Sequence, residues 1–345
     1  MSEQDRDQEQ ERDRNRDRDR ERDRERLRAA VEARVLADWG FELPDSLFRF
    51  HDFIGSLDPV EASAFADLEL WPYGVMDLFD APAAQARDGV DIRAHGRYYR
   101  DPPEFLTFLH GGTDGLHYGL WYDDGRTCAG VGSYYNNDDG GGIDRTCRTP
   151  LEAVRVTLER HWYDLHEDTG REPEEVAERA PGMARLRSKI GEFETGDRTA
   201  TGADYVRTHT YGYRRPPVEP GRITTLDGGG ALAAGETALG RPPHNGADEH
   251  AFGTHMAAVF ADPGELAAAV AEARRRLAAG DPTEALVLGR DLHWASVGDA
   301  TREGHAHELL AAAYRALDRP ALAAVADAHH RHRDLPRVDV LEPKS

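Results

Sequence analysis

The segment from His95 to Tyr135 constrains the fold of this chain more than any other part of the sequence. Aromatic and other apolar residues alternate with polar residues or glycine in several stretches, and turn-forming residues separate these stretches, HGRYYRDPPEFLTFLHGGTDGLHYGLWYDDGRTCAGVGSYY. Alternation with a period of two is typical of strands, and the glycine-rich run 111–115 is a hairpin signal. We therefore expect three antiparallel strands, over residues 105–110, 116–122 and 128–134, with a second turn at 123–125.

Helices are expected on both sides of these strands. Leu27, Val31 and Val35 recur at helical spacing, and Gly40 ends that helix. A second helix begins beside Pro44. Short aromatic strands are expected at 71–79 and 92–99, and a strong amphipathic helix begins at Pro150. This order predicts an α+β fold, with an antiparallel sheet flanked by helices.

Composition changes divide the chain further. Residues 1–26 alternate Arg with Asp or Glu and hold no apolar residue after Met1, so a disordered charged tail is expected. A folded N-terminal domain follows over 27–168, then a linker or surface helix over 169–203. A mostly helical C-terminal α/β domain is expected over 204–335. It contains a Gly/Ala/Pro-rich loop at 221–248, expected to be mobile, and helices at 266–277, 283–293, 304–317 and 320–332.

The charge balance restricts the partners that we expect. Acidic residues outnumber basic ones by 64 to 43, for a net charge of −21. Such a surface disfavours phosphate backbones and favours basic protein partners, so a protein partner and no nucleic acid are expected. The two cysteines have no metal-ligand spacing, and no apolar run reaches the roughly 18 residues of a membrane span. No targeting segment is visible, so a cytoplasmic location is expected.

Reactive motifs are missing from the sequence. The two histidine clusters, 305–307 and 329–332, are interpreted as solvated surface residues, and the pairs Asp123-Asp124 and Asp138-Asp139 as turn residues. No Gly-x-Ser-x-Gly elbow or phosphate loop occurs, so neither a nucleophile nor a cofactor is expected. Most of one aromatic set should form the core of the sheet, and some of it could line a partner-binding face: Tyr98, Tyr99, Phe105, Tyr118, Trp121 and Tyr122.

Two passages resemble known families. The first, LADWGFELPDSLFRFHDFIGSLDP, resembles the opening of the SUKH superfamily of α+β binding modules. The second resemblance is to the histone PARylation factor family, whose N-terminal domain has this fold. It rests on the order FRFHDFIGSLDP, HGRYYRDPPEFLTFLHG, LHYGLWYDDG and AGVGSYY. The run LVLGRDL, residues 286–292, is similar to the family's C-terminal Leu-Gly-x-Asp-Leu helix. The resemblance spans roughly residues 30–335 and is weak between 170 and 265.

The resemblance implies an accessory role in ADP-ribosylation. Animal members of the family dock on a poly(ADP-ribose) polymerase and lend it a glutamate that acts as general base. A gapless carry-over from the Leu-Gly-x-Asp-Leu helix places Ala279 at the position of that glutamate, and the nearest acids are Asp281 and Glu284. The family's docking string has its nearest look-alike at Tyr213-Arg214, earlier in the chain order. These four acidic and docking residues are the candidate site.

Two functions from different classes remain open. The favoured one is a non-catalytic protein-binding accessory factor that modulates ADP-ribosylation by a partner transferase. The alternative is a SUKH-type immunity protein, whose acidic body neutralises a basic toxin by direct contact. A self-sufficient enzyme that handles ADP-ribose is the least favoured, because the sequence shows no nucleotide-binding motif.

Overall fold

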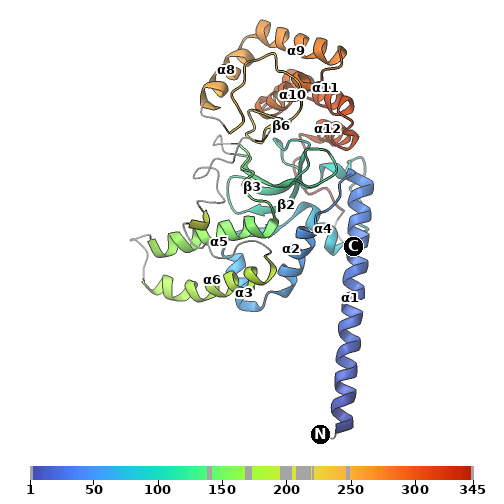
Figure 1. Cartoon of the computed structure of the whole chain (residues 1–345), viewed down its shortest axis with the longest axis vertical. Helices are drawn as coiled ribbons and strands as arrows, with labels where there is room; N and C mark the ends of the chain where they lie inside the picture. The colour runs from blue at the N-terminus through green and yellow to red at the C-terminus, as the bar shows by residue number, and fades with distance from the viewer. Residues whose placement is uncertain are drawn as a thin grey trace.

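The centre of the molecule is a four-stranded antiparallel sheet with strand order β1-β2-β3-β4. The computed structural model describes residues 3–137, 142–167, 173–194, 204–206, 219, 221–245 and 249–342. Figure 1 shows the sheet between two helical layers, with α2, α3, α5 and α6 on one side and α8 to α12 on the other. The predicted α+β class, with flanking helices and a mostly helical C-terminal part, is confirmed.

Three of the sheet's four strands lie where the alternating segment predicts them, and the first one precedes that segment. The strands are β1 (Leu70–Pro72), β2 (Phe105–Gly111), β3 (Leu116–Trp121) and β4 (Gly130–Tyr135). Phe105 pairs with Trp121, and His117 with Tyr134, so the tight turns fix the register of the two hairpins. The pairing of β2 with β3 is irregular between Thr107 and Leu109, where the register shifts as at a β-bulge.

Of the two other expected strands, that at 71–79 is much shorter than predicted and that at 92–99 does not form. The chain leaves the sheet after β1 and continues as a short 3-10 helix, η1 (Gly74–Met76), and α4 (Asp77–Asp80). Gly74 has φ of +65°, and a Cβ there would lie 2.4 Å from the carbonyl oxygen of Thr107, so this position requires glycine and ends the strand. Residues 92–94 form a second 3-10 helix, η2, because the Asp91 side chain accepts a hydrogen bond from the Arg93 amide.

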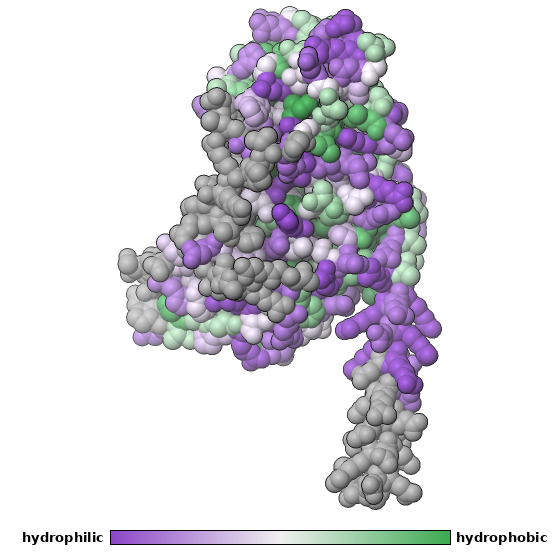
Figure 2. Space-filling model, in the orientation of Figure 1, coloured by the Kyte–Doolittle hydropathy of each residue, from purple (hydrophilic) through white to green (hydrophobic). Residues whose placement is uncertain are grey.

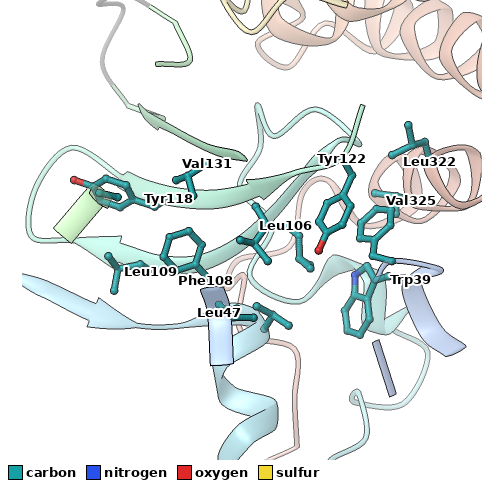
Figure 3. Close-up of a cluster of buried hydrophobic side chains, with 14 of the residues drawn as sticks. Trp39, Leu47, Leu106, Phe108, Leu109, Tyr118, Tyr122, Val131, Leu322 and Val325 are labelled. Atoms are coloured by element: carbon teal, nitrogen blue, oxygen red, sulfur yellow. The ribbon is translucent and has the colours of Figure 1, made fainter. Parts of the chain in front are cut away.

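Both faces of the sheet are buried. Side chains on one face, including Leu106, Phe108 and Leu120, pack toward α2 (Asp45–Ser56) and α5 (Pro150–Glu167). Figure 3 shows this cluster continuing past Tyr122 to Leu322 of the C-terminal part. The opposite face carries Phe105, Trp121, Tyr134 and Ile143, which pack against Trp294. Because both faces are covered, nearly every residue of β2 and β3 is buried, and not only every second one.

The first helix, α1 (Glu3–Trp39), includes most of the segment for which disorder was expected. Its last turns are anchored by the buried side chains of Val31, Val35 and Trp39, whereas residues 18–26 are exposed. Figures 1 and 2 show that this part projects from the body and is strongly hydrophilic where it is described. Arg and Glu favour helix, and Arg22–Asp19 and Arg26–Asp23 are pairs of opposite charge at helical spacing, so the anchored helix extends into the tail.

The expected linker contains a packed helix. Residues Pro173–Phe193 form α6, which lies against α3 (Pro59–Ala66) and α5. Met183, Leu186 and Ile190 are buried at this contact. Three apolar residues at spacings of three and four place one face of the helix in the core, so α6 belongs to the helical layer below the sheet.

Apart from the first, which was not predicted, the C-terminal helices in the described ranges follow the predicted ranges closely. They are α8 (Glu249–Ala261), α9 (Pro263–Ala278), α10 (Thr283–Ala295), α11 (Ala300–Ala316) and α12 (Pro320–His332). α10 packs on α11, and α11 on α12. None of the helices in the described ranges is long and apolar enough to cross a membrane.

The loop expected to be mobile is packed instead. Within residues 221–245, β5 (Arg222–Ile223) pairs with β6 (Ala231–Leu232), and the segment lies against the start of α10. Arg222, Thr225, Asp227 and His244 are buried. Gly, Ala and Pro predicted a loose chain, but these few polar side chains fix it by hydrogen bonds and ion pairs.

Close packing of α10 on α11 leads to a first prediction. A Cβ at Gly289 would lie 2.9 Å from Cγ and 3.2 Å from the amide nitrogen of Leu310. We expect Gly289→Ala to lower the free energy of unfolding by about 1–3 kcal/mol, because overpacking forces the helices apart. Gly304→Ala, in α11 with nothing nearby, should raise it by up to about 1 kcal/mol through helix propensity. Urea titration of both variants measures the difference, and equal signs would contradict the packing argument.

Candidate functional site

The loop between η2 and β2, residues 97–104, joins the sheet to the C-terminal helices. Asp101 is fully buried at its centre. Its carboxylate accepts hydrogen bonds from the Tyr98 amide (2.8 Å) and the Tyr134 hydroxyl (2.7 Å), and lies 2.7 Å from Nε2 of His117. Burial, together with the Asp101 charge, raises the pKa of Tyr134 well above its usual value. The phenol therefore stays protonated and keeps the loop in place.

Backbone groups of the same loop contact α10 and the end of α12. The Asp101 carbonyl lies 2.9 Å from Nε2 of His293. The Arg333 guanidinium donates to the carbonyls of Tyr99 (3.0 Å) and His293 (2.6 Å), and lies over the Tyr99 ring at 4.0 Å. One cation thus bridges the sheet domain and the C-terminal helices.

We call this contact between the sheet, the 97–104 loop and the C-terminal helices the joint. Arg290 of α10 is its central charge. Its side chain is completely buried and donates to Glu104 (2.9 Å) and Asp227 (2.6 Å), and it lies over the Trp121 ring. Burial alone would lower the pKa of Arg290, but the two carboxylates outweigh burial and raise it. The guanidinium is therefore permanently charged, and it joins three segments that are far apart in the sequence.

A second buried ion pair lies beside Trp121. Asp123 accepts from Arg222 at 2.6 and 2.9 Å and from the Trp121 indole at 2.8 Å, and Arg145 lies 3.5 Å away. Burial opposes the charge of Asp123, but Arg222 and Arg145 hold the pKa of its carboxyl at about 2. Of the predicted turn pair, only Asp124 is a plain turn residue, accepting from the Arg126 and Thr127 amides.

The joint has the features of a structural scaffold. Its buried charges neutralise each other, and the nearby pocket has a volume of about 10 Å³. That volume holds about one water molecule. The lining residues are Pro103, His293, Glu303, His307, Leu310, Ala326, His330 and Arg333.

Asp281 and Glu284, the two predicted acids, lie together at the start of α10 but in different surroundings. Asp281 is more than one-third exposed and accepts from the Thr283 amide (3.0 Å), as a turn residue does. Glu284 is 1% exposed, and its Oε2 accepts from the Ala238 amide at 2.6 Å. Ala279, which the alignment to the family's helix places at the glutamate position, is the C-cap residue of α9. Asp281 is therefore the accessible acid, and Glu284 is covered.

The other predicted sites have mixed outcomes. Tyr213 and Arg214 lie outside the described residues, as do Asp138 and Asp139. The interpretation of the histidine clusters as solvated is wrong for His329, which is 3% exposed because it lies on the inner face of α12 against His293. Within the described ranges, no group of three metal-ligating side chains occurs.

The aromatic set behaves as predicted for core residues. Phe105, Trp121 and Tyr122 are completely buried and Tyr118 nearly so. Tyr98 and Tyr99 are half-buried at the joint, where Tyr98 stacks on His117 and the Tyr99 hydroxyl donates to Glu303. The Tyr99 side chain therefore closes the joint against α11.

Sequence reasoning missed the buried ion pairs. Arg290 and its neighbour Asp291 stand in a helix whose residues 283–293 are all buried, and Asp291 pairs with Arg241 at 2.6 Å. A helix that is apolar all round and still holds adjacent opposite charges indicates paired burial. That signal was present in the run 286–292. The partners Asp227, Glu104 and Arg241 could not be named from it, because they lie 63, 186 and 50 residues away.

Fold and joint together define a class of protein: an α+β scaffold whose sheet is closed on both faces, with buried charges that hold shape. The family model described as histone PARylation factor 1 matches residues 26–193. This segment of the chain is therefore a domain of the histone PARylation factor 1 family, and the match supports a role like that of the family. The SUKH-like description stays a prediction, as does the likeness of residues 286–292 to the family's C-terminal helix.

Proposed function

We propose that this protein is a non-catalytic accessory factor that binds an ADP-ribosyltransferase and changes the amount or the residue choice of ADP-ribose transfer. The observation that carries the proposal is the family match over residues 26–193, which runs from the last part of α1 to the end of α6 and includes the whole four-stranded sheet. A protein that acts by presenting groups to a partner needs a rigid body, and the joint around Arg290 supports such a role.

The acids at the start of α10 are the groups that such a factor would present. Asp281 is accessible in the free protein, and Glu284 follows it within one helical turn. A carboxylate placed against a partner's acceptor hydroxyl can take its proton in the transfer step. Nothing else is required of this chain: the nicotinamide dinucleotide and the transfer chemistry belong to the partner.

A reconstitution assay tests the proposal. The full chain would be used to recover a transferase from the cells that express it, and the pair incubated with NAD⁺ and a serine-containing acceptor peptide. We expect the chain to change the yield of ADP-ribose transfer or the residue that is modified. The double variant Asp281→Asn, Glu284→Gln should reduce that effect at least tenfold, since a general base contributes about 10²–10⁴ in rate. Glu265→Gln, an exposed change in α9, is the matched control and should retain the effect.

Two outcomes would overturn the proposal. Recovery of no transferase, with no change in transfer when one is supplied, would remove the accessory role. Recovery of a basic toxin that the chain inhibits would favour the immunity alternative instead. Full retention by the double variant would leave the accessory role in place and exclude both acids as its base.

A further inference from the structure

A short segment of the packed loop crosses the start of α10. We call residues 233–241 the strap. The Gly235 amide donates to Oγ1 of Thr283 (3.0 Å), and the Ala238 amide donates to Oε2 of Glu284 (2.6 Å). Gly235 lies so close that a Cβ there would approach Oγ1 of Thr283 to 2.2 Å and Oδ1 of Asp281 to 2.5 Å. The strap therefore lies directly over the two predicted acids.

Glu284 is incompletely satisfied under the strap. Its other oxygen, Oε1, is buried and has no hydrogen-bond partner within the described part of the chain. The preceding residue at the helix start, Pro282, makes no side-chain cap. A buried carboxylate oxygen without a partner is costly, because water would otherwise solvate it. Opening the strap would let water solvate Oε1 again. This gain in free energy offsets part of the cost of breaking the contacts of the strap.

The middle of the strap is held by few contacts: the hydrogen bonds of the Gly235 and Ala238 amides, and one from Arg276 of α9 to the Glu236 carbonyl (2.9 Å). It has no regular secondary structure, and residues 234–236, 238 and 240 are exposed. Leu239 is only partly buried. Segments with few buried apolar contacts open locally at a much lower free energy than the whole protein.

Its ends are fixed firmly. Arg319 donates to the Leu232 carbonyl at 2.9 Å just before the strap, and Arg241 at its end pairs with the buried Asp291 at 2.6 Å. Fixed ends with a loosely held middle allow the strap to lift while β6 and α10 stay in place.

We propose that the strap is a cover, closed over Glu284 in the free protein and lifted when a protein partner binds this face, so that the Glu284 carboxylate is presented beside Asp281. The use of the exposed carboxylate rests on the proposed function, but the cover itself does not. Closed, the strap keeps a carboxylate away from solvent and from unrelated partners. Open, it adds a second acid to the accessible one.

Carboxyl labelling of the isolated full chain tests the cover. The protein would be treated with a water-soluble carbodiimide and glycine ethyl ester at increasing low urea concentrations, and labelling of each acid followed by mass spectrometry. We expect Glu284 to react through local opening, at a rate nearly independent of urea below the unfolding transition. Gly235→Ala should speed its labelling by roughly fivefold, since it breaks about one hydrogen bond of the cover. Gly240→Ala, on the same strap with open space around it, should not.

One labelling result would reject the cover. If Glu284 is labelled only as the whole protein unfolds, with the same urea dependence as core acids such as Glu104, the strap is part of the core and the cover is rejected. The wild-type measurement decides this even if Gly235→Ala fails to fold. Local labelling of Glu284 in a chain that never affects a transferase would keep the cover and reject the proposed function.

Discussion

Replacing Arg290 with methionine should lower the free energy of unfolding by about 3–5 kcal/mol, a large fraction of the stability of a domain. The change keeps the apolar stem but removes the cation between Glu104 and Asp227. Two buried carboxylates then lose the cation between them, although Asp227 still accepts from Thr225 and the Gly229 amide, and burial favours their protonation. Urea unfolding, followed by tryptophan fluorescence because Trp121 lies beneath the guanidinium, measures the loss.

The matched control for Arg290 is an exposed ion pair. Arg274 pairs with Glu308 between α9 and α11, and both side chains are about half exposed. Arg274→Met should cost at most about 1 kcal/mol, because solvent screens such pairs. Adding Glu104→Gln and Asp227→Asn to Arg290→Met should restore part of the loss. A loss for Arg290→Met no larger than that of the control would show that the joint does not depend on this charge.

Acid should destabilise the protein steeply below about pH 6.5, through histidines that are buried and neutral. Burial, with help from nearby arginines, lowers the pKa of His244 to about 4 and that of His293 well below its usual value. Burial beside His293 also lowers that of His329. Each takes up a proton on unfolding below the unfolded pKa of about 6.5, so stability is complete above that pH and falls as pH decreases.

The expected slope is large. Each neutral buried histidine contributes about 1.4 kcal/mol per pH unit, and the effect continues down to its folded pKa. Below about pH 4 the Asp123 carboxyl adds to the loss, because its pKa is held at about 2. Asp291 acts in the opposite direction just above pH 4, since burial raises its pKa.

A single substitution isolates one of these histidines. Neither ring nitrogen of His329 has a hydrogen-bond partner within the described residues, so His329→Leu should be neutral or stabilising at pH 7.5. It should also flatten the dependence of the unfolding free energy on pH by about 1.4 kcal/mol per unit between pH 6 and 5. Replacing the exposed His250 with leucine should leave the curve unchanged. An unaltered slope for His329→Leu would mean that this ring does not take up a proton on unfolding.

Local patterns predicted much of the fold. The alternation of residues 105–122 and the glycines between the strands fixed β2 and β3, and apolar spacing placed α9 to α12. Errors arose where a single contact decided the outcome. Gly74 ends the first strand because of its approach to Thr107, and an aromatic pattern carries no information on that contact. Similarly, the Gly/Ala/Pro composition of 221–248 predicted looseness, whereas Arg222 and Asp227 fix the segment.

The candidate site was predicted only in part. Sequence order placed Asp281 and Glu284 at the start of a helix, which is confirmed. It gave no sign that Glu284 is covered, because the covering residues, 233–241, lie more than 40 positions earlier and carry no motif. Burial of one of two neighbouring acids depends on tertiary contacts, and a period or a motif does not encode these.

The sheet with two buried faces has a consequence for how this protein can be divided. The segment that matches the family ends at residue 193, yet Trp294 of α10 closes the face that Phe105 and Tyr134 present, and Arg290 neutralises Glu104. A chain cut after residue 193 would display an aromatic surface and an orphaned carboxylate, so we expect it to aggregate rather than to fold alone. The two parts therefore form a single folding unit, because each supplies side chains that the other needs for burial and for charge pairing.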